Sequence, residues 1–233
     1  MHLAVELPRG GPGAPAPEFE TWAALARAAE RGLFDFVLLT AGEGGATADR
    51  GGRCGPDPVT VLHALAAVTT RIGLAVAVPP PDAGRGSYEL ARGIAALDRL
   101  SGGRAGGPPW RFGDPAGPQG RPVAMGFGGT AEVLLAGRPP AGRRARVLSR
   151  VDLAADAAAT PAAAREFADR LHAGVQSAAA DGFVLRPDPA AAGRGLDAFV
   201  DRVVPLLQER GSLRTAYTGE TLRDHLGLPR PVR

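Results

Sequence analysis

The stretch DPVTVLHALAAVTTRIGLAVAV, residues 57–78, holds one complete helix-and-strand unit. Asp57 is a preferred helix N-cap and Pro58 stands at the first helical position, so the sequence predicts a helix over 57–71. The run IGLAVAV that follows, residues 72–78, is continuously apolar and predicts a buried strand, which three consecutive prolines end. The unit therefore predicts a helix followed by a buried strand, as in a parallel sheet covered by helices.

The same alternation continues along the rest of the chain. Apolar runs predict further strands at 3–7, 34–39, 121–128, 131–137, 144–154 and 182–187. Helical spacing of apolar residues predicts further helices at 18–31, 87–100, 160–180 and 196–211. One more strand, at 104–112, is weak, because Pro108 and Pro109 cannot donate hydrogen bonds to a sheet.

Alternating strands and helices predict an α/β fold with a parallel sheet. We expect a single domain over residues 1–233, an abbreviated TIM (β/α)8-type barrel with a weak or missing fourth strand. If residues 104–112 form only a loop, the barrel has an open edge that a neighbouring chain would cover. An open doubly wound sheet is the alternative, although no G-x-G-x-x-G turn follows the first strand.

Composition excludes several kinds of chemistry. All 27 basic residues are arginine, which excludes a Schiff-base lysine and a P-loop lysine. Five arginines cluster within residues 138–150, but no interleaved aromatic residue or binding motif accompanies them, so we expect no nucleic-acid partner. Cys54 has no partner for an internal disulfide, and the 4 histidines lack metal-ligand spacing. We therefore expect no metal site.

The chain also lacks membrane and export signals. Its N-terminal residues have no signal-peptide core, and no apolar run reaches membrane-spanning length. We expect a cytoplasmic protein with no membrane partner.

In a parallel barrel the chemistry gathers where the strands end. The residues predicted at these ends, such as Leu7, Leu153 and Pro187, are poor in acids and bases. Asp35 opens a strand and is expected at the opposite, structural end of the barrel. A hydrolase or isomerase needs a positioned His, Glu or Lys at the strand ends. The pattern instead suits a cofactor that carries the chemistry, or no chemistry at all.

Four segments resemble the bacterial luciferase-like flavin monooxygenases, in the branch of the nitrilotriacetate and dibenzothiophene-sulfone monooxygenases. They are RGLFDFVLL (31–39), DPVTVLHALAAVTTRIGL (57–74), YELARGIAALDRLSGGRAG (88–106) and RGSLRTAYTGETLRDHLGLPRP (210–231). PQGRPVAMGFGGT, residues 118–130, is similar to the family's strand before its phosphate-binding turn. The resemblance implies a TIM barrel, with a family-type C-terminal tail at 212–233.

The resemblance also implies a cofactor and partners. Members bind reduced FMN, supplied by a separate flavin reductase, and use it to oxygenate a small organic substrate. Carried over by position, the resemblance assigns the cofactor contacts to Ala41, Ala77, Gly128, Gly129 and Thr130. Ala41 replaces a family Asp and Ala77 a family Thr, whereas Thr130 keeps the hydroxyl of a family Ser. No catalytic residue is assigned.

The losses relative to the family concentrate around the flavin. After Gly107 the family continues into a long flavin-contacting segment, whereas this chain passes through GPPWRFGDPAG to PQGRPV. The helix whose N-terminal amides would bind phosphate is also missing after Thr130. Two hypotheses follow. One is a shortened FMNH2-dependent monooxygenase, whose activity is reduced or absent in the isolated chain. The other is a degenerate barrel that serves as a partner subunit in a homo- or hetero-oligomer, or binds a ligand weakly.

Overall fold

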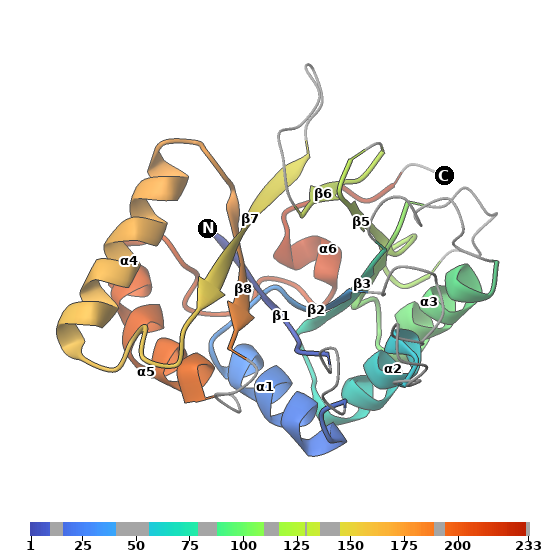
Figure 1. Cartoon of the computed structure of the whole chain (residues 1–233). Helices are drawn as coiled ribbons and strands as arrows, with labels where there is room; N and C mark the ends of the chain where they lie inside the picture. Colours follow the sequence, from blue (N-terminus) through green and yellow to red (C-terminus); the bar gives the residue numbers. More distant parts are fainter. Residues whose placement is uncertain are drawn as a thin grey trace.

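A computed structural model describes residues 1–9, 16–40, 56–78, 88–109, 117–128, 130–135, 145–188 and 194–231. The elements in chain order are β1 (His2–Glu6), α1 (Phe19–Arg31), β2 (Phe36–Thr40), α2 (Pro58–Val68), β3 (Gly73–Ala77), α3 (Tyr88–Leu100), β4 (Ala105–Gly107), β5 (Val123–Gly126), β6 (Val133–Leu134), β7 (Arg146–Leu153), α4 (Pro161–Gln176), β8 (Gly182–Pro187), α5 (Arg194–Glu209) and α6 (Leu222–His225). The described strands form one closed parallel barrel in the order β1 to β8 (Figure 1).

The predicted TIM-type barrel is therefore confirmed, and the open doubly wound alternative is wrong. Each strand pairs with the next in parallel, and β8 pairs back with β1. The fourth strand is short but present, since the three residues of β4 pair with β3 and β5. No open edge exists at this position for a neighbouring chain to cover.

Glycine explains why β4 gives so weak a signal in the sequence. A Cβ atom placed on Gly107 would lie 2.4 Å from Cδ1 of Ile94 in α3, and one on Gly106 would lie 2.9 Å from Cε of Met125 in β5. The backbone of β4 thus packs closely against its neighbours, and a side chain at either position would require Ile94 or Met125 to shift. Hydrophobic periodicity cannot report a strand made of such residues.

Among the described residues, five helices cover the outside of the barrel, and the predicted N-cap at Asp57 is confirmed. The Asp57 carboxylate accepts a hydrogen bond from the Thr60 amide at 2.8 Å at the start of α2. The Thr160 hydroxyl accepts one from the Ala163 amide at 3.2 Å at the start of α4. Among the described residues between β4 and β7 there is no helix, so one side of the barrel has a thinner outer layer (Figure 1).

The apolar core has two parts. The larger lies between the barrel and its helices, where Phe34 and Phe167 each meet Phe199 edge to face. The smaller fills the barrel interior and includes Phe36 and Leu38 of β2. Burial of these side chains supplies the main driving force for folding.

The short helix α6 closes one end of the barrel. Its Leu222 and the following Leu226 belong to the interior cluster. The Leu222 amide donates to the Gly103 carbonyl just before β4, and Arg146 at the start of β7 donates from Nε to the Leu226 carbonyl at 3.1 Å. In Figure 1, α6 lies within the ring of strands. The C-terminal segment therefore occupies the end where the strands begin, which we call the closed end.

Asp35, immediately before β2, is the centre of the closed end's polar network. Its carboxylate is fully buried and accepts hydrogen bonds from the Leu3 amide at 2.8 Å and from His2 Nδ1 at 3.1 Å. It also pairs with the Arg214 guanidinium. Burial alone would raise the pKa of Asp35, but His2 and Arg214 hold it below its ordinary value. Asp35 is thus a structural residue at the end where the sequence places it.

Candidate functional site

The opposite end of the barrel, where the strands end, has charged side chains on its interior wall. Successive residues of a strand point to opposite faces, so residues two apart share a face. The interior cluster includes Ala4 of β1, Leu38 of β2, Leu148 of β7 and Val184 of β8. The residues two positions further along the same strands are Glu6, Thr40, Arg150 and Arg186. We call this end the open end.

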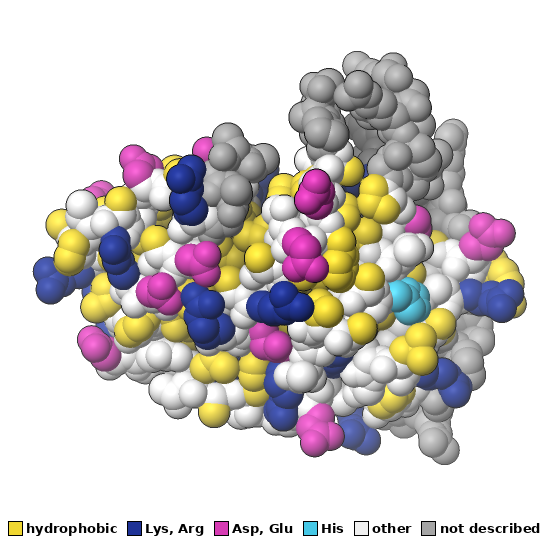
Figure 2. Space-filling model, turned by 90° about the horizontal axis from the view of Figure 1, so that it is seen from below, with side chains coloured by type: hydrophobic (Ala, Val, Ile, Leu, Met, Phe, Trp, Pro, Cys, Tyr) yellow, Lys and Arg dark blue, Asp and Glu magenta, His cyan; other side chains and the backbone are white. Residues whose placement is uncertain are grey.

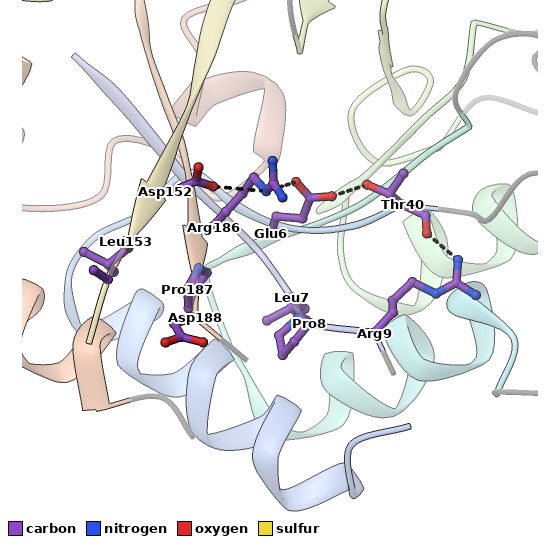
Figure 3. Close-up of a pocket in the computed structure, with 11 residues that line it drawn as sticks. Glu6, Leu7, Pro8, Arg9, Thr40, Asp152, Leu153, Arg186, Pro187 and Asp188 are labelled. Atoms are coloured by element: carbon purple, nitrogen blue, oxygen red, sulfur yellow. Dashed lines mark hydrogen bonds and ion pairs between the residues drawn. The ribbon is translucent and has the colours of Figure 1, made fainter. Parts of the chain in front are cut away.

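A cleft of about 510 Å³ lies at the open end, between the ends of β1, β2, β7 and β8. Ligand pockets commonly have about 300–1,000 Å³, so this cleft is large enough for a small organic molecule. Its polar lining residues are Glu6, Arg9, Thr40, Asp152, Arg186 and Asp188 (Figure 3). Figure 2, viewed from the side towards which β7 and β8 point, shows charged side chains of both signs beside a group of hydrophobic ones.

Glu6 is the centre of the charged network at the open end. Its Oε1 accepts a hydrogen bond from the Thr40 hydroxyl at 2.6 Å. Its Oε2 lies 3.3 Å from Arg150 Nε and 4.0 Å from Arg186 Nε. Arg186 also pairs with Asp152 at 3.5 Å, which links β1, β2, β7 and β8 across the cleft (Figure 3).

Two further contacts hold this network in place. Arg9 donates from Nη1 to the Thr40 carbonyl at 2.5 Å, and burial lowers the pKa of its guanidinium. The Arg150 guanidinium lies 5.0 Å from the centre of the Phe127 ring, directly after β5, in a cation–π contact. The site thus draws side chains from both sides of the barrel.

The expectation that the strand ends are poor in acids and bases is wrong. Glu6 is the last residue of β1, Asp152 the next to last of β7, and Arg150 lies further inside β7, so all three stand just before the end residues that the sequence predicted. The signal that finds them is the alternation of side-chain direction: in RVLSRVDL the interior positions are Leu148, Arg150 and Asp152. Sequence reasoning that considers only the last residues of each strand misses this inward row.

The structure does not bring the predicted cofactor contacts together in the cleft. Ala77 is fully buried at the end of β3, in the interior cluster. Gly128 and Thr130 are exposed beyond β5, and none of these three residues lines the cleft. Ala41 and Gly129 lie outside the described residues. The five positions therefore stay predictions.

Among the described residues, no helix begins after Thr130 whose N-terminal amides could hold the phosphate of FMN. A phosphate site usually uses the amides of a helix N-terminus. Thr130 is followed by β6 at Val133–Leu134, and the described part of the chain from 117 to 135 contains no helix. The absence predicted after Thr130 is thus confirmed for these residues, and no chemical step is derived through the flavin.

Neither a metal-binding cluster nor a membrane-spanning helix is found among the described residues. No group of three or more His, Cys, Asp or Glu side chains is arranged to hold a metal ion. None of the helices in these parts of the chain is long and apolar enough to cross a membrane.

The fold and the cleft define a (β/α)8-type barrel with a charged ligand site at its strand ends. Residues 1–106 match the sequence model of the luciferase-like monooxygenases. The resemblance noted in the sequence is confirmed over this part of the chain.

Similar proteins point the same way. Over 66 residues the chain is 52% identical to a dibenzothiophene-sulfone monooxygenase of Rhodococcus erythropolis, covering 28% of this chain and 14% of that protein. Over 67 residues it is 46% identical to an N-acetyl-S-(2-succino)cysteine monooxygenase of Bacillus subtilis (strain 168), covering 29% and 15%. The matched segment thus spans about one seventh of the length of these relatives.

Among solved structures, the chain is similar to an EDTA monooxygenase from Chelativorans sp. BNC1. The TM-score is 0.71 at 20% identity, and the match covers 99% of this chain and 98% of the other. At this identity the similarity shows the fold alone.

Proposed function

We propose that this chain is a flavin-dependent monooxygenase-type oxidoreductase that acts on a small organic substrate. The observation that carries the proposal is the charged cleft of about 510 Å³ at the strand ends, in a barrel whose residues 1–106 match the luciferase-like monooxygenases. Reduced FMN, delivered by a separate flavin reductase, would supply the redox chemistry. The described residues of the cleft are assigned only the binding and orientation of the substrate.

Anaerobic titration with reduced FMN, followed by admission of oxygen, tests this proposal. We expect saturable binding, and flavin reoxidation that is slower in the presence of the protein than for free flavin. No saturation up to high micromolar flavin would overturn the proposal.

Thr130 offers a matched pair of variants for the same titration. If its hydroxyl contacts the flavin phosphate, Thr130→Val weakens FMN binding by roughly ten- to a hundredfold, because a hydrogen bond to a charged group is lost. Thr130→Ser keeps the hydroxyl and should bind as the parent chain does. Riboflavin, which has no phosphate, should bind the parent and Thr130→Val equally, whereas equal FMN affinity of all three chains would remove Thr130 from the cofactor site.

A second function is favoured by one observation, the missing helix after the exposed Thr130 in the described residues. Without phosphate amides the barrel serves as a partner subunit or a weak ligand-binding protein, with no turnover of its own. Sedimentation analysis of the chain co-expressed with a full-length luciferase-like monooxygenase distinguishes the two functions. A stable hetero-oligomer without saturable flavin binding in the isolated chain supports the second, and a strictly monomeric chain contradicts a partner role.

A further inference from the structure

The open end contains buried polar atoms that have no hydrogen-bond partner among the described residues. They are Nε and Nη2 of Arg150 and Oε2 of Glu6. A buried donor or acceptor without a partner is unfavourable, so such atoms call for an explanation by a bound group. Arg150 Nε and Glu6 Oε2 form an ion pair at 3.3 Å that does not meet hydrogen-bond geometry, and Nη2 has no hydrogen-bond partner among the described residues.

The two unpartnered nitrogens of Arg150 form one edge of its guanidinium. The N–H bonds of Nε and Nη2 point the same way, at the spacing of the two oxygens of a carboxylate. The Cζ atom of Arg150 lies over the Phe127 ring, 5.0 Å from its centre, in a cation–π contact. The Arg150 side chain is 29% exposed, but Nε and Nη2 are themselves buried and Arg150 does not line the cleft, so a ligand takes this edge only when the side chain turns towards the cleft.

The charge around Arg150 favours an anion. Within the network, Arg150 and Arg186 face one carboxylate with low exposure, that of Glu6, which is 19% exposed. The other acidic partner, Asp152, is 83% exposed, so water screens its charge. Glu6 also keeps a hydrogen bond from Thr40, so it retains a partner when Arg150 turns to another anion.

We propose that Arg150 and Glu6 form an exchange site for the carboxylate of a small organic substrate. The incoming carboxylate takes the Nε and Nη2 edge of Arg150, while Glu6 remains bound to Thr40 and near Arg186. The site assigns the substrate class of the cleft and so rests on the proposed function. No covalent step is involved.

The test compares benzoate with its neutral counterpart benzamide, by calorimetric titration of the whole chain without flavin. We expect benzoate to bind and benzamide to bind at least about tenfold more weakly, since only the carboxylate accepts both N–H groups. Equal binding of the two probes, or none by benzoate, would overturn the site.

Two variants test the exchange in opposite directions. Arg150→Gln should weaken benzoate binding by about ten- to a hundredfold, and Arg150→Lys by an intermediate factor, because lysine keeps the charge but loses the planar edge. Glu6→Gln should strengthen binding, because it removes the competing anion. Arg27→Gln on α1, where Arg27 is 52% exposed, is the control and should change nothing. Weaker binding by Glu6→Gln would overturn the exchange, and thermal melts of each variant check folding.

Flavin phosphate is another source of an oxyanion, and competition separates it from a substrate carboxylate. If FMN displaces benzoate and riboflavin does not, Arg150 holds phosphate and the substrate assignment is overturned. Displacement by neither supports it. Because the titration contains no reduced flavin, benzoate binding can succeed while the oxidoreductase proposal fails, and the reverse.

Discussion

The two ends of the barrel use the same kinds of charged residues to different effect. At the closed end, both oxygens of Asp35 and of Glu132 accept hydrogen bonds, and Arg223, which pairs with Glu132 at 2.8 Å, is 1% exposed. At the open end, Glu6 leaves one oxygen without a hydrogen bond and Arg186 is 53% exposed. A carboxylate whose two oxygens both accept hydrogen bonds stabilises the fold, whereas one with an oxygen that accepts none, beside an exposed arginine, is suited to exchanging partners. The difference separates the scaffold from the site.

The largest expected effect is at the closed end. Asp35→Asn removes the charge that neutralises Arg214, which is 12% exposed, and leaves that guanidinium buried without an anion. We expect the free energy of unfolding to fall by about 3–5 kcal/mol, as for other broken buried ion pairs. Urea denaturation measures it, with the exposed Asp156→Asn as control. A loss below about 1 kcal/mol would show that the closed end does not depend on this pair.

His225, at the end of α6, should make stability pH-dependent. It is 3% exposed, stacks on Tyr217 at 4.7 Å between ring centres, and lies near Arg214, Asp35, Arg71 and Asp224. Burial lowers its pKa to about 4. Below about pH 6.5, His225 is therefore protonated in the unfolded chain but stays neutral in the folded chain. The free energy of unfolding falls by about 3 kcal/mol between that pH and about pH 4.

The variant His225→Phe keeps the aromatic stack and removes the titration. Thermal or urea unfolding across this pH range should give a much flatter profile than the parent chain. Asp35 and Glu132 contribute little to the difference between the two pH profiles. Their pKa values are lowered in the folded protein, so their contribution is complete above about pH 4 and is lost only at lower pH. If the variant's stability changes with pH between about 4.5 and 6.5 as steeply as the parent's, His225 is not the group responsible.

The smallest expected effect on stability is at the open end. Arg186→Gln removes an exposed ion-pair partner of Asp152, and such pairs contribute about 0–1 kcal/mol. Urea unfolding in the same buffer as for Asp35→Asn measures the contrast directly. A loss above about 2 kcal/mol would mean that the open end is also part of the scaffold, and the comparison of the two ends would fail.

The framework of the fold was readable from the sequence, because most strands and helices follow local patterns. The runs FVLLT and GLAVA and the caps at Asp57 and Thr160 all act within a few residues. β4 gave a weak signal because Ala-Gly-Gly has almost no side chains to show a period. The position of α6 was not readable, although Thr221 and Asp224 form a capping box, since a cap does not tell where a helix packs.

The candidate site was less readable for a related reason. Asp35 and Arg214 meet across 179 positions of the chain, and Glu6 meets Arg150 only when β1 and β7 flank β8. Contacts of this kind depend on the register of the closed barrel, not on any local pattern. The family resemblance directed attention to Thr130 and Ala77, whereas the network of the cleft lies on other strands.

The wall of the barrel is unequally strong around its circumference. β7 and β8 pair over six residue positions, whereas β4 with β5, β5 with β6, and β6 with β7 pair over two each. We therefore expect local opening between β4, β5, β6 and β7 before the rest of the wall opens, because fewer backbone hydrogen bonds must break there. Such an opening would expose the barrel interior to solvent from the side, between the short strands.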